Sequence, residues 1–236
     1  MQRLRASLYL KDKAIHAADL TQDGRHVLEA DAYSWHLLTV SGDDVLGCAR
    51  YLQHRSTVDF DELKVNSASL AKSPQWGEKL RAAVEAELKL ARMQQLSYVE
   101  MGGWAISERI QGTSEALRSV LATFAWGLHI GGALGLCTAT ERNGSASILR
   151  RLGGRSLEYE GAPLPAYYDE QYRCNMEVLR FSSGSPNPRY VHIIEELRAE
   201  MPDVPVVWAQ EHSRVRTIPN FAPSVVRAPE RILLSA

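Results

Sequence analysis

Residues 98–114 read YVEMGGWAISERIQGTS, and this stretch decides the expected fold. Its first nine residues are mostly apolar or aromatic and favour a β-strand, with the pair Gly102-Gly103 at its centre. Two adjacent glycines in a strand predict a bulge or the close approach of another group to the backbone. A helical period begins at Ser114, and its apolar face consists of Leu117, Val120, Leu121, Phe124 and Leu128. A strand, a turn of small residues and a helix N-terminus, in this order, offer free amide N–H groups to a bound phosphate.

The composition is that of an ordinary globular protein. The chain has 236 residues, of which 45% are hydrophobic and 23% are charged, and its formal net charge is −1. This charge gives no general attraction to nucleic acid or to an anionic membrane. The sequence has no apolar run that would span a bilayer and no leader, and its three cysteines are far apart, so we expect a cytoplasmic protein. The seven histidines show no ligand spacing, and we expect no metal site.

Turn signals and hydrophobic periods divide the rest of the chain into elements. The runs WHLLTV at 35–40 and VLGCARYL at 45–52 flank a polar turn and predict a β-hairpin. The other expected strands are 7–10, 133–140 and 174–181, and the other expected helices are 74–94, 145–152 and 190–201. We expect one domain over residues 1–208 and an extended or partly disordered tail over 209–236, which has three prolines and no clear period.

Two motifs give this order of elements a family resemblance. The spacing Arg109-x-x-Gly112-x-Ser114 resembles the R/Q-x-x-G-x-G/A pyrophosphate loop of the GNAT acyltransferases, with serine in the last position. About thirty residues later, RNGSASILRRLGG at 142–154 resembles the N-x-x-A/S-x-x-x-L-x-x-x-G motif of the same family. The resemblance implies an α/β (α+β) fold with a mixed, mostly antiparallel central sheet flanked by helices. It also implies a coenzyme A or phosphopantetheine donor held by Arg109, Gln111, Gly112, Thr113, Ser114 and Asn143.

Three further residues narrow the resemblance within the family. Asp31 precedes the hairpin, Arg50 ends the run Gly-Cys-Ala-Arg in its second strand, and Glu100 precedes the phosphate loop. This order resembles the acyl-homoserine-lactone synthases and the related long-chain N-acyl amino acid synthases. It implies that Asp31, Arg50 and Glu100 line an acceptor site, with Glu100 as the base that takes the proton of the amine. The E-x-S-R-F motif of the lactone synthases is replaced by EMGGW at 100–104. This departure favours an amino acid or another small amine over S-adenosylmethionine.

Simpler structural roles compete with several of these assignments. Glu100 and Arg50 also suit a structural ion pair, and Asp31 suits a cap of the hairpin. The position of the usual tyrosine acid after Asn143 is held by Leu149 or Arg150. The acid for the leaving thiolate is therefore either missing or one of Tyr167, Tyr168 and Tyr172, which also suit loop packing. The basic cluster of Arg150, Arg151 and Arg155 suits either a solvated face or a docking patch for acyl carrier protein or the coenzyme A 3′-phosphate.

The function expected from the sequence is therefore an N-acyltransferase. It would move a fatty acyl group, favoured to be long, from an acyl carrier protein or coenzyme A thioester to the amine of a small acceptor such as an amino acid. The alternatives are a short-chain acetyltransferase that uses acetyl-coenzyme A, and a non-catalytic module of this fold that binds acyl thioesters.

Overall fold

The structure, a computed structural model, describes residues 1–207 and 231–235, with the backbone alone for Asn143 and for the second segment. Most of the tail expected over 209–236 lies outside the described residues. Its last part forms strand β10, which pairs in parallel with the first strand of the hairpin. Among the described helices, none is long and apolar enough to cross a membrane.

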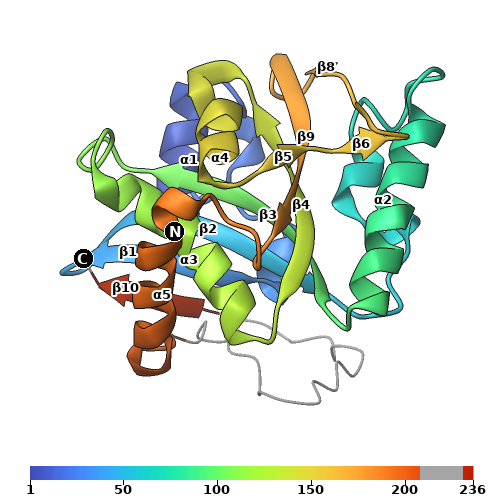
Figure 1. Cartoon of the computed structure of the whole chain (residues 1–236). Helices are drawn as coiled ribbons and strands as arrows, with labels where there is room; N and C mark the ends of the chain where they lie inside the picture. Colours follow the sequence, from blue (N-terminus) through green and yellow to red (C-terminus); the bar gives the residue numbers. More distant parts are fainter. Residues whose placement is uncertain (208–230, 236) are drawn as a thin grey trace.

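One sheet of eight strands organises the chain (Figure 1). Its strands are β1 (Trp35–Ser41), β2 (Asp44–His54), β3 (Ser97–Ile106), β4 (Ala133–Thr140), β5 (Arg155–Ser156), β8 (Tyr167–Asp169), β9 (Cys174–Ser182) and β10 (Arg231–Ser235). Their order is β10-β1-β2-β3-β4-β9-β5, and β8 also pairs with β9. Only the pairs β1/β10 and β3/β4 are parallel, so the expected mixed, mostly antiparallel sheet is confirmed. A second small sheet joins β6 (Glu158–Tyr159) to β7 (Ala162–Pro163).

Helices cover both faces of this sheet. The α-helices are α1 (Gln2–Lys11), α2 (Gly77–Met93), α3 (Ser114–His129), α4 (Ser145–Leu152) and α5 (Val191–Glu200). Short 3-10 helices are η1 (Ala17–Asp19), η2 (Glu29–Tyr33), η3 (Phe60–Glu62), η4 (Lys64–Ser67), η5 (Arg142–Gly144), η6 (Pro188–Tyr190) and η7 (Met201–Asp203). Figure 1 shows α3 and α5 side by side across the sheet, and the two helices are in contact.

The alternation of side chains along the strands separates two cores. Trp35, Leu37, Tyr51 and Val99 join α3, α4 and α5 in one core. Tyr98 and Leu136, on the opposite face, join α2 and the 3-10 turns η3 and η4. Each fully buried Leu, Val or Phe stabilises the fold by about 1.5–3 kcal/mol, so both cores make large contributions. Because Glu100 follows Tyr98 by two residues, its side chain also lies on the α2 face.

The first helix is the main error of the sequence prediction. The run from Ser7 to Leu10 was expected to be a strand, and it lies inside α1. The helix packs on the sheet through residues at helical spacing, Met1, Leu4 and Leu8, which contact the buried side chains of β1 to β3. A four-residue apolar run fits a strand and a helix equally well. The helical period becomes visible only in a longer window that starts at residue 1.

The pairing between strands β3 and β4 ends in the middle of the sheet. Their parallel pairing runs from Ser97↔Ala133 to Glu100↔Leu136 and ends there. Beyond this point β3 pairs only with β2, and β4 pairs only with β9. The carboxyl ends of β3 and β4 therefore diverge, with Glu100 at the branch point. Ligands of open sheets commonly bind outside the carboxyl ends of parallel strands.

Candidate active site

The glycine pair of β3 makes room for two arginines. The register between β2 and β3 shifts between Cys48 and Arg50, which confirms the predicted bulge. A Cβ atom on Gly102 would lie 3.2 Å from Arg50 Nη2, and one on Gly103 would lie 3.3 Å from Arg5 Nη1. Gly103 also has a φ of 61°, which L side chains rarely adopt. The group that approaches the backbone closely is therefore a pair of guanidinium groups.

Asp31 forms a buried ion pair with Arg5 of α1. Arg5 Nη1 and Nη2 donate to its two carboxylate oxygens at 3.0 and 2.5 Å, and the amide of Leu28 donates at 3.1 Å. Burial of Asp31 would raise its pKa, but the hydrogen bond and charge of Arg5 outweigh this and lower the pKa to about 2. Asp31, which lies in η2, is thus the ionised partner of Arg5, and its side chain does not cap the hairpin.

Arg50 lies beside this pair with unused donors. Its Nη1 is 3.8 Å from Asp31 Oδ1, too far for a hydrogen bond. Among the described residues, its buried Nε and Nη1 atoms have no hydrogen-bond partner. Burial lowers the pKa of Arg50, and the neighbouring charge of Asp31 partly offsets this effect. A buried guanidinium with free N–H groups is a ready binding site for a carboxylate.

Glu100 is held by two backbone amides and by the ring of His54. Its Oε1 accepts from the amide of Val65 at 3.0 Å, and its Oε2 accepts from the amide of Lys64 and from His54 Nε2, each at 3.0 Å. The side chain is buried. The ion pair with Arg50 that the sequence allowed is not formed, because His54 and the η4 backbone occupy the carboxylate. One acceptor position remains open on Oε1.

Among the three tyrosines considered as proton donors, Tyr172 is the one whose pKa responds to the charges of Arg50 and Arg5. Burial and Asp169 raise its pKa, while the charges of Arg50 and Arg5 oppose the shift. Tyr167 is buried against the α2 core, and burial likewise raises its pKa. Tyr168 is about half exposed.

The predicted phosphate loop has the expected open amides. Its residues 111–114 are exposed, and the amides of Gln111 and Gly112 have no acceptor within the described chain. The N-cap Thr113 makes no side-chain hydrogen bond to the first turn of α3, so that turn is also open. Gly112 has a φ of 76° with free space where a side chain would begin. Arg109 donates to Asp44 at 2.7 Å, and Gln111 Nε2 donates to the carbonyl of Ile106, so these side chains brace the loop.

The second motif lies at the end of β4. Asn143 is part of η5, between β4 and α4, and its side chain is outside the described atoms. Both motifs thus follow the carboxyl ends of the diverging strands. In the basic cluster, Arg150 forms an ion pair with Glu177, while Arg151 and Arg155 are exposed.

Comparison with known proteins bears on this arrangement. No protein-family model matches the sequence, and no curated protein matches it. Two solved structures of BjaI, a CoA-dependent acyl-homoserine lactone synthase, match with a TM-score of 0.51 and 16% identity over 91% of this chain and 85% of that chain. One holds MTA and the other holds SAM and isopentyl-CoA. This chain shares its fold with BjaI.

A third solved structure is more distant. It is FeeM, an N-acyl amino acid synthase from uncultured soil microbes, with a TM-score of 0.41 and 10% identity. The match covers 61% of this chain and 65% of FeeM, slightly under two thirds of that protein. The comparison of folds therefore uses the two BjaI structures.

Within this fold, the structure adds residues that the sequence did not indicate. Asp31 and Arg50 come together as expected, but Arg5 completes their cluster, and His54 and the η4 backbone complete that of Glu100. The sequence did not indicate Arg5, because helix α1 was not among the predicted elements. His54 carried a weak signal, since it lies two residues beyond Leu52, the cross-strand partner of Glu100. In the described part of the chain, no group of three or more His, Cys, Asp or Glu side chains could hold a metal ion.

Proposed function

We propose that the chain is an N-acyltransferase that joins a fatty acyl group from a thioester to the amine of a small carboxylate-bearing acceptor, such as an amino acid. The observation that carries the proposal is the position of Glu100. It is a buried carboxylate at the point where the pairing of β3 with β4 ends, on the strand that leads to the open amides of Gln111 and Gly112. The fold shared with BjaI supports the same chemistry.

The acceptor would bind through the free donors of Arg50. The Nε and Nη1 atoms of this guanidinium suit a carboxylate, and a carboxylate there would relieve the unpaired buried donors. The amine of the acceptor would then lie toward Glu100, which takes its proton directly or through a water. The nitrogen attacks the thioester carbonyl carbon, the C–S bond breaks, and the leaving thiolate takes a proton from Tyr172. The nitrogen loses its second proton as the amide forms, and this proton returns to the Tyr172 oxygen. Burial raises the pKa of Tyr172 above its usual range, in which a tyrosine hydroxyl is already protonated at neutral pH.

The donor would bind at the two motifs. The amides of Gln111 to Ser114 and the positive end of the α3 dipole would hold its phosphates, together with Arg109 and Asn143. An amide beside Gly102-Gly103 would stabilise the oxyanion. The CoA dependence of BjaI favours acyl-CoA. Acyl carrier protein is the other donor, and it would dock on Arg150, Arg151 and Arg155, of which Arg150 is already paired.

One observation favours a short acyl chain as a second candidate. The cavity between Val99, Met101 and Phe124 on the α3 face has a volume of about 10 Å³, room for roughly one water. A long chain in this place would have to displace aromatic side chains. Acetyl or another short acyl group would need no such change.

Mass spectrometry of organic extracts would test the proposal and identify the product. Bacteria expressing the chain should contain fatty acyl amides that are absent from bacteria expressing Gly112→Trp, which fills the open loop. Acyl transfer by the purified protein should also fall at least 100-fold in Glu100→Gln with donor binding retained. Matching extracts, together with full activity of Glu100→Gln, would exclude this function. Short-chain products alone would select the second candidate.

A further inference from the structure

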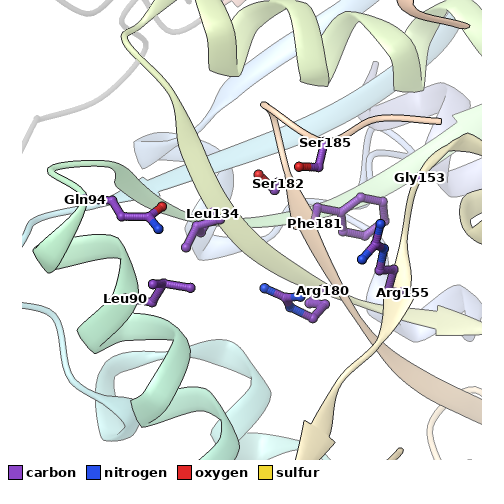
Figure 2. Close-up of a pocket in the computed structure, with 9 residues that line it drawn as sticks. All are labelled: Leu90, Gln94, Leu134, Gly153, Arg155, Arg180, Phe181, Ser182 and Ser185. Atoms are coloured by element: carbon purple, nitrogen blue, oxygen red, sulfur yellow. The ribbon is translucent and has the colours of Figure 1, made fainter. Parts of the chain in front are cut away.

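A polar cavity lies at the amino-terminal end of β4, away from the candidate active site. It has a volume of about 200 Å³ and lies beside the start of β4 and the end of β9 (Figure 2). The donor loop follows the carboxyl end of β3, whereas this cavity meets β4 at Leu134, its second residue. The lining residues are Leu90, Gln94, Leu134, Gly153, Arg155, Arg180, Phe181, Ser182 and Ser185.

Strand pairing places two arginines of this cavity directly opposite each other. Arg155 of β5 and Arg180 of β9 are direct partners in the antiparallel register, so their side chains leave the sheet on the same face. Like charges in directly opposite positions repel and destabilise a sheet. An anion between the two guanidinium groups would remove this repulsion.

The surrounding charges leave one positive charge uncompensated. Glu87 of α2 pairs with Arg180 Nη2 at 2.9 Å, which balances one arginine. Arg180 Nε and Glu87 Oε2 are buried without a hydrogen-bond partner among the described residues. The side chain of Arg155 is exposed and makes no ion pair or hydrogen bond with the described part of the chain. One excess positive charge suits a monoanion better than a doubly charged phosphate, because Glu87 would repel the second charge.

The walls of the cavity combine hydroxyl and apolar groups. Ser182 and Ser185 carry hydroxyls that can donate to an oxyanion, and both line the cavity on the β9 side, as Figure 2 shows. Phe181, Leu134 and Leu90 supply an apolar surface beside them. A ligand with one charged end and a short hydrocarbon end would satisfy both kinds of wall.

We propose that this cavity binds a small aliphatic carboxylate, with Arg155 and Arg180 holding its carboxylate group. The site is independent of the acyl-transfer function proposed above. It shares no residue with the Asp31–Arg50 cluster, with Glu100 or with the loop at 107–113. Arg155 of β5 is the one residue that it shares with the basic cluster of Arg150, Arg151 and Arg155.

Titration of the ¹⁵N-labelled full chain with butyrate, followed by NMR, tests this assignment. Butyrate should shift the amide signals of Gly153, Ser182 and Ser185 in a saturable manner, and n-butylammonium should not. Arg155→Gln should weaken butyrate binding at least tenfold, whereas Arg198→Gln on the exposed face of α5 should leave it unchanged. Arg180→Gln is a second variant that should also weaken butyrate binding, and it leaves Glu87 without its ion-pair partner.

The alternatives give different results. Binding of inorganic phosphate without butyrate would overturn the carboxylate assignment. Equal binding by the wild type and Arg155→Gln would overturn the role of the arginine pair. Absence of any saturable shift would overturn the site itself. Arg155→Gln alters an exposed residue, so a folded variant is expected and its spectrum provides the check.

Discussion

Asp31 and Glu100 are two buried carboxylates, and the protein holds them in different ways. Asp31 is paired with the guanidinium of Arg5 through two N–H groups. Glu100 is held by two backbone amides and one imidazole nitrogen. A proton on Asp31 would leave the buried guanidinium of Arg5 without its counter-ion, whereas Glu100 accepts from no arginine or lysine side chain. The difference favours Glu100 as the proton acceptor and gives Asp31 a positioning role.

The largest expected effect comes from breaking the Asp31 pair. Arg5→Met removes the cation but retains an apolar stem of similar length, so Asp31 keeps a buried charge with only the distant Nη1 of Arg50 as its counter-ion. We expect a loss of about 3–5 kcal/mol in the free energy of unfolding, measured by urea denaturation. The control is Arg198→Met, at an exposed position.

The double variant Arg5→Met/Asp31→Leu sharpens this test. Replacing both members of a buried pair with apolar residues is often neutral or stabilising, so the double variant should regain much of the loss. If Arg5→Met alone unfolds at the same urea concentration as the wild type, Asp31 is not dependent on Arg5.

The second prediction concerns acid. The folded-state pKa of Asp31 is about 2, below the value of about 3.9 that aspartate has in an unfolded chain. Its ionised form therefore adds stability that is complete above the unfolded pKa and is lost as the pH falls toward 2. We expect about 2–3 kcal/mol to disappear between about pH 5 and pH 2. Asp31→Asn, although less stable at neutral pH, should lack this part of the acid dependence. Parallel curves for both proteins would contradict the assignment.

The same two carboxylates show how far sequence reasoning reaches. The sheet, the hairpin and the strand-loop-helix around residue 100 follow from local periods and glycine signals, and the structure confirms them. The clusters do not follow, because their members are distant in sequence. Arg5 meets Asp31 only after α1 packs on the sheet, and Glu100 meets the amides of η4 only after that turn folds over the α2 face. Backbone donors carry no residue type that a motif could reveal.

The third prediction tests the holding of Glu100. Glu100→Gln keeps the shape, but its amide nitrogen must face a donor from His54 or from the η4 backbone. We expect a loss of about 1–3 kcal/mol, smaller than that of Arg5→Met, because no charge is left unpaired. Chemical denaturation is the measurement, with Glu195→Gln on α5 as the control. A loss as large as that of Arg5→Met would remove the distinction between the two carboxylates.

The smallest expected effect belongs to His54. His54→Leu removes one of three donors to Glu100 and leaves the two backbone amides in place, so the loss should be about 1 kcal/mol. His54→Gln restores a donor and should recover part of that loss. A double-mutant cycle with Glu100→Gln measures the coupling directly, and we expect about 0.5–1 kcal/mol. The corresponding cycle of Arg5 and Asp31 should give a coupling several times larger. Equal couplings would mean that the imidazole supports Glu100 as strongly as a guanidinium supports Asp31, and Glu100 would then be no better placed than Asp31 to accept a proton.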